Sequence, residues 1–247
     1  MEFKGKTILI TGGGSGIGFA LAERFLNGGS VVIVCGRNEE KLKEAKSKFP
    51  QLNIRVCDVA NSHERINLFQ WTQREFPELN VLVNNAGIQD RFSITEKPED
   101  WERHHKEIAI NFEAPVHLSQ LFVPQLEKMK DAYIINVTSG LAFIPGSFAP
   151  IYSATKAAMH SFTMSLRHQV KKSGIKVIEI IPPAVQTDLG GAGLHTFGEP
   201  LNEFADAVMS RVAAGEIEIG YGMSEQGRKA SREQIDAQFE AMNNRWQ

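Results

Sequence analysis

Short runs of apolar and β-branched residues alternate along the chain with segments whose apolar positions recur at helical spacing. Such runs, bounded by glycine, asparagine or proline, are typical of buried strands. The predicted strands are residues 6–11, 30–35, 52–57, 79–83, 131–138, 174–181 and 216–220. This alternation predicts the α/β class, with a doubly wound parallel sheet of about seven strands flanked by helices.

The segments between these strands predict the helices. They are residues 19–26, a helix beginning near Glu39, and residues 62–75, 97–129, 152–172 and 201–214. Ser62 is the expected N-cap of its helix. Within 97–129 an interruption is expected around 111–115, because Pro115 has no N–H to bond the carbonyl of Asn111. A carbonyl freed in this way needs another partner, so Asn111 is a candidate anchor for an ordered water.

Composition limits the classes of function. The chain has 247 residues, 42% of them hydrophobic, and 27 basic against 29 acidic side chains. This near balance disfavours nucleic acid and anionic membranes as partners. No signal peptide and no apolar stretch of about 18 residues is visible, so we expect a cytoplasmic protein without membrane insertion. We also expect one domain over residues 1–247, without repeats or linkers.

Cysteines and histidines predict no metal site. Cys35 and Cys57 lie in apolar runs and are expected to be reduced core residues. His104 and His105 are neighbours without metal-ligand spacing, and we expect them on a helix surface or at an interface.

A glycine-rich turn follows the first predicted strand and opens a helix. Gly12, Gly16 and Gly18 would let backbone N–H groups approach a pyrophosphate, whose charge suits the positive end of the helix. This strand–turn–helix context is the one that a dinucleotide site of a Rossmann fold requires. The alternative is a tight turn without a ligand.

The end of the second predicted strand bears on the choice of cofactor. An NAD-preferring site commonly has an acidic residue here, but position 36 is glycine and Arg37 follows it. A guanidinium suits a 2′-phosphate, so Arg37 favours NADP(H), while NAD(H) stays open. The alternative is a surface arginine in a turn.

Tyr152 and Lys156 lie four positions apart on a predicted helix and thus share one face. An ammonium group beside a phenol favours the phenolate, so Lys156 is expected to lower the pKa of Tyr152 towards neutral pH. Ser139, at the end of the fifth predicted strand, could hold a carbonyl oxygen beside the tyrosine. Alone, such a pair is more often a solvated helix face.

Together these segments resemble the short-chain dehydrogenase/reductase family of the ordinary type, from Gly5 to about Leu189. The motifs that carry the resemblance are Thr11-Gly12-x-x-x-Gly16-x-Gly18, Asp58-Val59, Asn84-Asn85-Ala86-Gly87, Asn111, Ser139, Tyr152-x-x-x-Lys156 and Pro182-x-x-Val185-x-Thr187. The chain also resembles, more weakly, the oxidoreductases associated with the D-alanylation operon for teichoic acids.

The resemblance implies a catalytic tetrad. Tyr152 would be the general acid/base, Lys156 would lower its pKa and bind the nicotinamide ribose, and Ser139 would hold the substrate oxygen. Asn111 would hold the water of a proton relay.

The resemblance also implies a cofactor site. The glycine turn of this chain would bind the pyrophosphate. The region around Asp58 would bind the adenine, and the segment that begins at Pro182 would bind the nicotinamide. The residues implied are Gly12, Ser15, Gly16, Ile17, Gly18, Arg37, Asp58, Val59, Asn85, Ala86, Gly87, Tyr152, Lys156, Pro182, Val185 and Thr187.

A substrate pocket is expected beside this site. Residues 187–200, rich in glycine and apolar side chains, predict a mobile cover, and the candidate lining is mostly apolar, which favours a small to medium-sized carbonyl or alcohol. Ordinary core packing is the alternative for each lining residue. The candidates are Gln89, Leu141, Phe143, Phe148 and Leu189, with Phe92, Val185 and Phe197 as further members. Asp90 and Arg91 could orient a polar group or be solvated loop residues.

Two features depart from the family pattern. Pro183 stands where the family commonly has glycine, which stiffens the loop expected beside the nicotinamide. The chain also continues through a polar, helical extension over about 224–247, where the family commonly has a short tail at a subunit interface. We therefore expect a homodimer that pairs through the helices near 101–129 and 152–172.

The sequence thus predicts an NADP(H)-dependent oxidoreductase that moves hydride between the nicotinamide and a carbonyl or secondary alcohol. Two alternatives stay open: an NAD-dependent alcohol dehydrogenase, and a dinucleotide-binding regulator without turnover.

Overall fold

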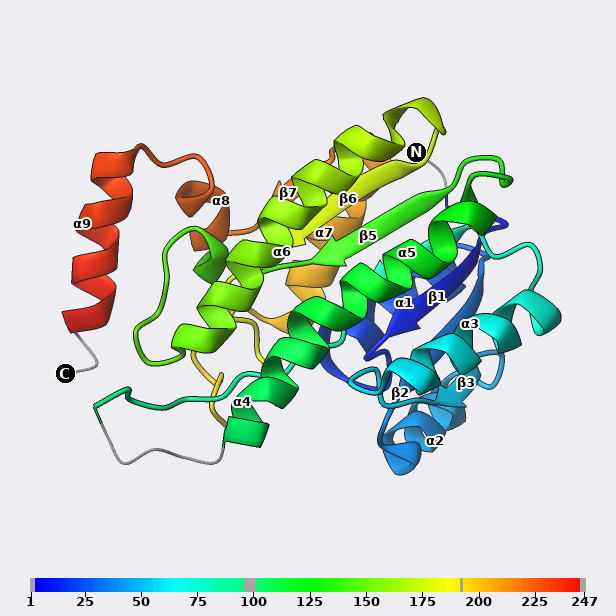
Figure 1. The fold of residues 1–247 in the computed structure, drawn as a ribbon, viewed down its shortest axis with the longest axis horizontal. Helices are drawn as coiled ribbons and strands as arrows, with labels where there is room; N and C mark the ends of the chain where they lie inside the picture. Colours follow the sequence, from blue (N-terminus) through cyan, green and yellow to red (C-terminus); the bar gives the residue numbers. More distant parts are fainter. Residues whose placement is uncertain (1–2, 96–100, 192, 245–247) are drawn as a thin grey trace.

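The computed structural model describes residues 3–95, 101–191 and 193–244. In this part of the chain, seven strands form one parallel sheet in the order β3-β2-β1-β4-β5-β6-β7. The strands are β1 (Thr7–Thr11), β2 (Val31–Gly36), β3 (Asn53–Val56), β4 (Val81–Asn84), β5 (Tyr133–Val137), β6 (Lys176–Ile181) and β7 (Glu218–Gly220). The predicted α/β class and doubly wound sheet are confirmed (Figure 1).

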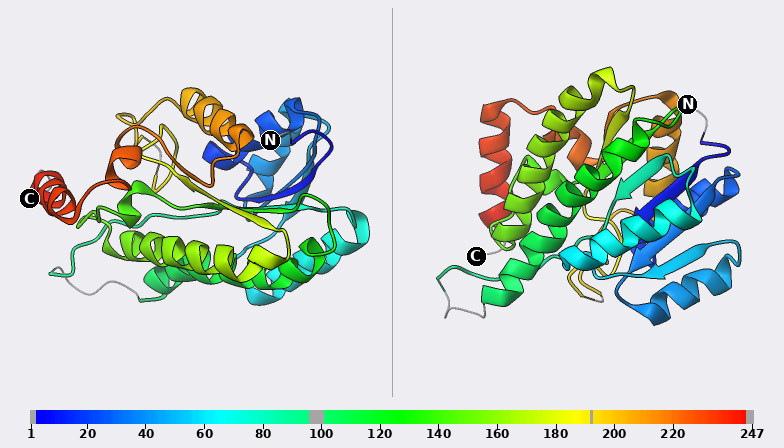
Figure 2. Two further views of the ribbon diagram at one scale, coloured as in Figure 1. Left: turned by 90° about the horizontal axis from the view of Figure 1, so that it is seen from above. Right: turned by 45° about the vertical axis from the view of Figure 1, so that its right-hand side comes forward.

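Helices cover both faces of the sheet (Figure 2). They are α1 (Gly16–Asn27), α2 (Glu39–Lys48), α3 (Ser62–Glu75), α4 (Trp101–Ile108), α5 (Ala114–Leu126), α6 (Pro150–Gln169), α7 (Leu201–Ala214), α8 (Met223–Gly227) and α9 (Arg232–Asn243). Parallel strands need crossover connections, and helices α1 to α7 supply them, whereas α8 and α9 follow the last strand.

Side chains alternate between two cores because successive strand residues point to opposite faces. In β1, Ile8 and Ile10 pack with α1, α2 and α7, whereas Leu9 packs with α3, α5 and α6. All three side chains are fully buried. The cysteines are confirmed as buried core residues, both with free thiols.

A π-helical turn, Ala109–Glu113, joins α4 to α5. This is the interruption that Pro115 predicts, and it widens the helix at Asn111. The joined helices run beside α6 (Figure 1), and side chains of α4 contact the loop after the carboxyl end of β4.

Two local expectations need correction. The N-cap of α3 is Asn61, whose side chain accepts from the N–H groups of His63 and Glu64, and Ser62 is already helical. His104 does not lie on the helix surface: it is buried against the Phe92 ring, with 4.3 Å between ring centroids, because its face of α4 packs on the loop after β4. His105 is exposed, as expected.

The C-terminal helix α9 stands at the edge of the molecule (Figure 1). Its last residue, Asn243, donates to the carbonyl of Pro145 at 3.1 Å and accepts from the N–H of Ser147 at 2.6 Å. The end of α9 is therefore tied to the loop between β5 and α6. Within the described ranges, no helix has the length and apolar character needed to cross a membrane.

Candidate functional site

The glycine turn after β1 packs tightly against the loop after β4. A Cβ on Gly12 would lie 2.8 Å from the Cα of Ala86, and one on Gly18 would lie 2.4 Å from Nδ2 of Asn85. Gly12 and Gly16 also have positive φ angles, +66° and +54°, which favour glycine. The two predicted cofactor segments thus come together, and larger residues at these positions would separate them.

Thr11 joins these two loops by hydrogen bonds. Its Oγ1 accepts from the N–H groups of Asn85 and Ala86, both at 3.0 Å. The Asn85 amide donates to the carbonyls of Thr11 and Gly12 at 2.9 and 3.2 Å. The sequence reasoning gave Thr11 no role of its own, although its place in the motif was visible.

The N–H of Gly12 does not face a ligand. It donates to the carbonyl of Cys35 at 2.8 Å, and the N–H of Gly13 does so at 3.3 Å. Gly12 thus serves close packing, not N–H donation as expected from the sequence. The N-terminus of α1, at Gly16, is what this turn offers to an anion.

The second and third strands end beside the same turn. Arg37, directly after β2, is exposed. Asp58 is partly buried and pairs with Lys106 (Oδ2 to Nζ 3.5 Å), whereas Val59 is buried. The Glu64 side chain holds the N–H of Asp58 at 2.7 Å.

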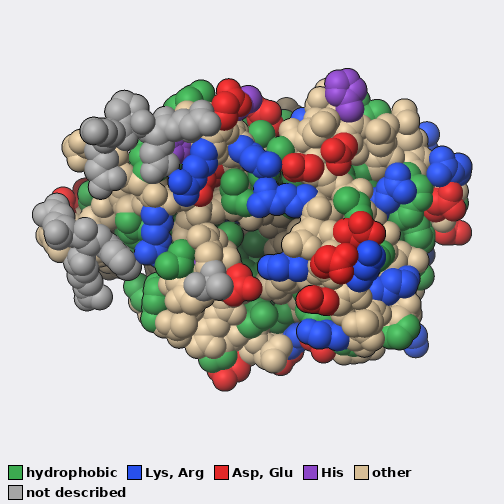
Figure 3. Space-filling model, turned by 90° about the horizontal axis from the view of Figure 1, so that it is seen from below, with side chains coloured by type: hydrophobic (Ala, Val, Ile, Leu, Met, Phe, Trp, Pro, Cys, Tyr) green, Lys and Arg blue, Asp and Glu red, His purple; other side chains and the backbone are tan. Residues whose placement is uncertain are grey.

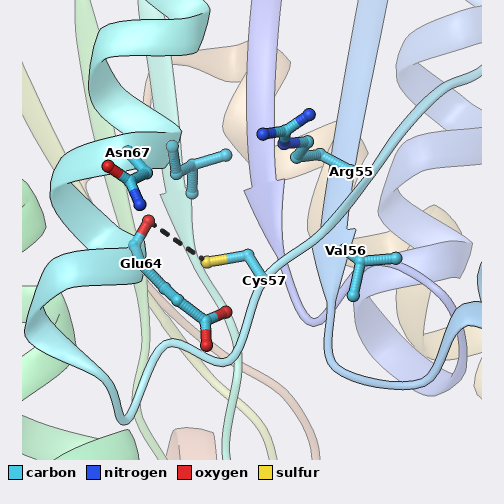
Figure 4. A pocket seen from close by; sticks show the side chains of 6 residues that line it. Arg55, Val56, Cys57, Glu64 and Asn67 are labelled. Carbon is cyan, nitrogen blue, oxygen red and sulfur yellow. Dashed lines mark hydrogen bonds between the residues drawn. The ribbon is translucent and has the colours of Figure 1, made fainter.

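A cavity of about 200 Å³ lies behind this segment, between β3 and α3 (Figure 4). Cys57 points into it and contacts the carbonyl of Glu64 through Sγ at 3.7 Å. None of the tetrad residues lines this cavity, so we do not assign it to the chemistry.

The tetrad meets at the carboxyl end of β5. Ser139 follows β5, Tyr152 and Lys156 lie on the first turns of α6, and all three are buried. Ser139 lies close enough to Tyr152 to act on its pKa, and its Oγ accepts from the N–H of Leu141 at 3.1 Å. Lys156 donates from Nζ to the carbonyl of Val137 at 2.9 Å, and Nζ lies 5.5 Å from the centre of the Tyr152 ring.

Burial sets the charge states of this pair. It raises the pKa of Tyr152 to about 12, while the nearby Ser139 side chain acts in the opposite direction. It lowers the pKa of Lys156 to about 8, against the opposing charges of Glu107 and Glu179. The expected lowering of the Tyr152 pKa by Lys156 is not found in this structure: burial has the largest influence on this pKa, and Nζ of Lys156 donates to the carbonyl of Val137.

Asn111 occupies the π-helical turn and fixes the loop after β4. Its Oδ1 accepts from the N–H of Ile88 at 2.9 Å, and its Nδ2 donates to the carbonyl of Ile88 at 2.8 Å and to Thr155 at 3.3 Å. A Cβ on Gly87 would lie 3.4 Å from Oδ1 of Asn111 and 3.7 Å from Nζ of Lys156. Asn111, Gly87 and Lys156 are therefore neighbours.

The segment after β6 closes the site. The Pro182 carbonyl accepts from the N–H of Gly140 at 2.8 Å, and Val185 is buried in a short bridge with Glu199. A Cβ on Gly16 would lie 3.4 Å from Cγ2 of Thr187. This brings the expected nicotinamide segment to the glycine turn and closes residues 186–199 into a loop at its base.

The expected substrate residues are spread over three loops. Gln89 is buried and touches Gly190; Phe143 stacks on His160 with ring centroids 4.6 Å apart. The Arg91 guanidinium lies 5.0 Å from the ring centre of Phe148, so Arg91 packs on an aromatic ring. The remaining members differ in exposure: Leu141, Leu189 and Phe92 are partly buried, whereas Phe197 is 65% exposed.

Sequence reasoning missed two buried polar residues near these loops. Glu107, on α4, is fully buried, and His195, in the 186–199 loop, is 8% exposed. Burial and the charge of Arg91 lower the pKa of His195. Neither stands in a motif, and only the fold shows that they face inward.

One face of the molecule is hollowed near its centre, and both Lys or Arg and Asp or Glu side chains lie around the hollow (Figure 3).

Comparison with known proteins defines the class. The family model for short chain dehydrogenase matches residues 6–195. This chain belongs to the short-chain dehydrogenase family and is an oxidoreductase. The family binds NAD or NADP, and the resemblance seen in the sequence is confirmed.

Similar proteins and solved structures show which members of the family this chain resembles. The uncharacterized oxidoreductase DltE of Bacillus subtilis (strain 168) is 44% identical over 98% of both chains, which agrees with the weaker resemblance seen in the sequence. A short chain dehydrogenase from Burkholderia cenocepacia J2315, solved in complex with NADP, matches at a TM-score of 0.84 and 25% identity over 97% of this chain and 99% of that one. The L-sorbose reductase of Gluconobacter frateurii, complexed with NADPH and L-sorbose, matches at 0.70 and 31% over 76% and 73%.

Proposed function

We propose that this protein is an NADP(H)-dependent oxidoreductase that interconverts a carbonyl and a secondary alcohol of a small to medium-sized substrate. The observation that carries the proposal is the meeting of Ser139, Tyr152 and Lys156 at one buried point beside Asn111. A binding protein without turnover has no physical need for this set of groups.

The chain's residues fit a dinucleotide. Gly12 and Gly18 leave no room for a side chain where the strand meets α1, and the N-terminus of α1 suits the pyrophosphate. Ser15, Ile17, Asp58, Val59 and the 85–87 loop would complete the binding surface, and Pro182, Val185 and Thr187 would lie along the nicotinamide. The bound cofactor supplies or accepts the hydride.

Tyr152 then moves the proton. In reduction its hydroxyl protonates the substrate oxygen that Ser139 holds, and in oxidation its phenolate removes the alcohol proton. Lys156 stabilises the phenolate by its charge, and Asn111 holds the loop after β4 and a relay water. Because burial raises the pKa of Tyr152 to about 12, the hydroxyl is the resting form, which suits reduction.

Arg37 would select NADP(H). It is exposed at the carboxyl end of β2, where position 36 carries no acidic side chain. The NADP and NADPH complexes of two matched structures support this choice as properties of those proteins. The substrate would lie between Gln89, Leu141, Phe143, Phe148 and Leu189.

Two further properties belong to the proposal. We place the enzyme in the cytoplasm as a homodimer that pairs through α4, α5 and α6. Trp101 on α4 is 62% exposed and Met164 on α6 is 51% exposed, which suits a partner helix face. Sedimentation of Met164→Glu tests the dimer: a shift from two-chain to one-chain mass supports it, and a wild-type monomer contradicts it.

Tyr152→Phe tests the function. With carbonyl substrates screened against NADPH, we expect turnover to fall on the order of 10²–10⁴-fold, because the proton donor is lost while the ring remains. Tyr221→Phe is the matched control, since the Tyr221 ring packs edge-on against Phe204 of α7. Wild-type turnover in Tyr152→Phe would contradict the assignment.

A further inference from the structure

Glu107 is a buried carboxylate that the mechanism above does not use. It lies on α4 and is 0% exposed. Its Oε1 accepts from the N–H of Asp90 at 3.0 Å, while Oε2 has no hydrogen-bond partner among the described residues. Buried carboxylate oxygens are nearly always paired, so this one calls for an explanation.

Glu107 lies about one helical turn before Asn111, on the same side of the helix. Both residues hold the main chain after β4: Asn111 at Ile88 and Glu107 at Asp90. Asn111 in turn neighbours Lys156 across Gly87. The carboxylate is therefore near the tetrad, where its charge raises the pKa of Lys156 and also that of Tyr152.

The charged groups that act on Glu107 come from three elements. Asp90 in the loop after β4 opposes its charge, while Arg103 on α4 and Lys156 on α6 favour it. Arg103 is already paired with Asp90 (Nη2 to Oδ1 2.9 Å). Burial outweighs these charges and raises the pKa of Glu107 to about 7, so its charge changes within the working range of pH.

Lys156 has two buried carboxylates acting on its charge, Glu107 and Glu179. Glu179 is engaged on both oxygens, by Thr138 at 2.7 Å and by His160 at 2.9 Å. Glu107 has only one backbone N–H. Its negative charge is thus the less neutralised of the two, and it can act on the ammonium of Lys156.

We propose that Glu107 is a positioning residue of the reaction: its carboxylate keeps Lys156 in the ammonium form, and its bond to Asp90 fixes the loop that carries Gln89. This inference rests on the proposed function. Ionised Glu107 favours the charged lysine that Tyr152 needs, whereas protonated Glu107 does not. The carboxylate of Glu107 therefore affects the reaction only at pH values at which Glu107 has lost its proton.

Glu107→Gln separates the two roles. The amide oxygen can still accept from Asp90, but the charge is gone. We expect kcat of Glu107→Gln to match wild type near pH 6 and to fall to about a fifth of it at pH 8, as for a one-unit fall in the Lys156 pKa from about 8. A purely structural role would lower kcat by the same factor at every pH, which would overturn the proposal.

Two further variants serve as controls for Glu107→Gln. Glu107→Asp keeps the charge but shortens the reach to Asp90, so we expect a raised KM with a wild-type pH profile of kcat. Glu113→Gln makes the same substitution at an exposed position of the neighbouring π-helical turn and is expected to leave both unchanged. A wild-type profile for Glu107→Gln, or an altered one for Glu113→Gln, would contradict the proposal.

A readout without turnover keeps this test independent of the proposed function. The ε-carbon NMR signal of Lys156, identified by its absence in Lys156→Arg, reports the lysine charge in the protein alone. We expect its midpoint at lower pH in Glu107→Gln than in wild type and Glu113→Gln. An unchanged midpoint overturns the inference even if the enzyme is active. A shifted midpoint with no turnover on any carbonyl contradicts the proposed function instead.

Discussion

The two sides of the site are built differently. On the side of the glycine turn, Thr11 and Asn85 tie two loops together through four hydrogen bonds of 2.9–3.2 Å. On the side of the expected substrate loops, Gln89, Glu107 and His195 are buried, and each has a polar atom without a partner among the described residues. On the first side the two loops hydrogen-bond to each other. On the second side, buried polar atoms and titratable groups are left that could bond to a ligand.

This difference separates what a family shares from what one member does. A dinucleotide needs the same backbone cradle in each enzyme that binds it, so that side can be rigid and complete. A substrate differs between enzymes, and unpaired buried groups are where its polar atoms or a reaction proton can be met. We therefore expect small substitutions on the first side to lower the stability of the fold and its cofactor binding. On the second side we expect the main effects to depend on pH.

The largest effect is expected at Gly18. A Cβ there would meet Asn85 at 2.4 Å and the Gly12 carbonyl oxygen at 2.5 Å, both in tightly held loops. Gly18→Ala should cost at least about 3 kcal/mol of unfolding free energy, the upper end of overpacking, and abolish NADPH binding. Gly14→Ala is the control, since its Cβ would lie nearest the flexible end of Leu42, at 3.2 Å, and no closer than 3.6 Å to the backbone of α2. Equal denaturation midpoints for the two variants would contradict the rigid side.

Glu107 should make stability depend on pH. Its pKa is raised from 4.5 to about 7 in the folded protein, so the folded state holds the proton more tightly than the unfolded one. The stabilisation is complete below pH 4.5 and is lost as pH rises to about 7, by as much as about 3 kcal/mol. Urea unfolding of wild type and Glu107→Gln across this range measures it. A constant difference between them would refute the linkage.

A change at Thr11 should be milder. Thr11→Val removes the oxygen that accepts from the N–H groups of Asn85 and Ala86, and leaving buried donors unpaired costs about 1–3 kcal/mol. Thr11→Ser keeps that oxygen and should lose far less. Thermal unfolding compares the two, and equal losses would mean that the methyl group, not the hydrogen bonds, matters.

Arg37 should have the smallest effect, confined to one cofactor. Arg37→Ala removes a charged donor suited to a 2′-phosphate and should weaken NADPH binding about ten- to hundredfold, with NADH binding unchanged. Lys41→Ala, on the exposed start of α2, is the control. Equal weakening of both cofactors by Arg37→Ala would remove Arg37 as the phosphate reader.

Much of this architecture can be read from the sequence. The seven strands fall within about two residues of the predicted runs, because each is short, apolar and bounded by turn residues. The interruption at Asn111 could be predicted as well, since a proline removes one specific hydrogen bond. The tetrad residues stand in motifs that can be recognised from the spacing of residues in the sequence alone.

Other features could not be predicted because they depend on packing between distant segments. Glu107 looks like one more charged residue of a helix, and only the loop after β4 buries it. The inward His104 is of the same kind. The high pKa of Tyr152 follows from burial, whereas residue spacing had shown only the lysine beside it. Ser62 and Asn61 are both good capping residues, and which of them caps α3 depends on where the backbone becomes helical, which is at Ser62.

A paired titration of the wild-type protein with NADPH and NADH, followed by nicotinamide fluorescence, tests the central claim most directly. We expect saturable binding of both with a clear preference for NADPH, because Arg37 stands at the end of β2 without an acidic neighbour at position 36. Tighter binding of NADH would contradict the cofactor assignment. Binding of neither would contradict the proposed dinucleotide-dependent reaction itself.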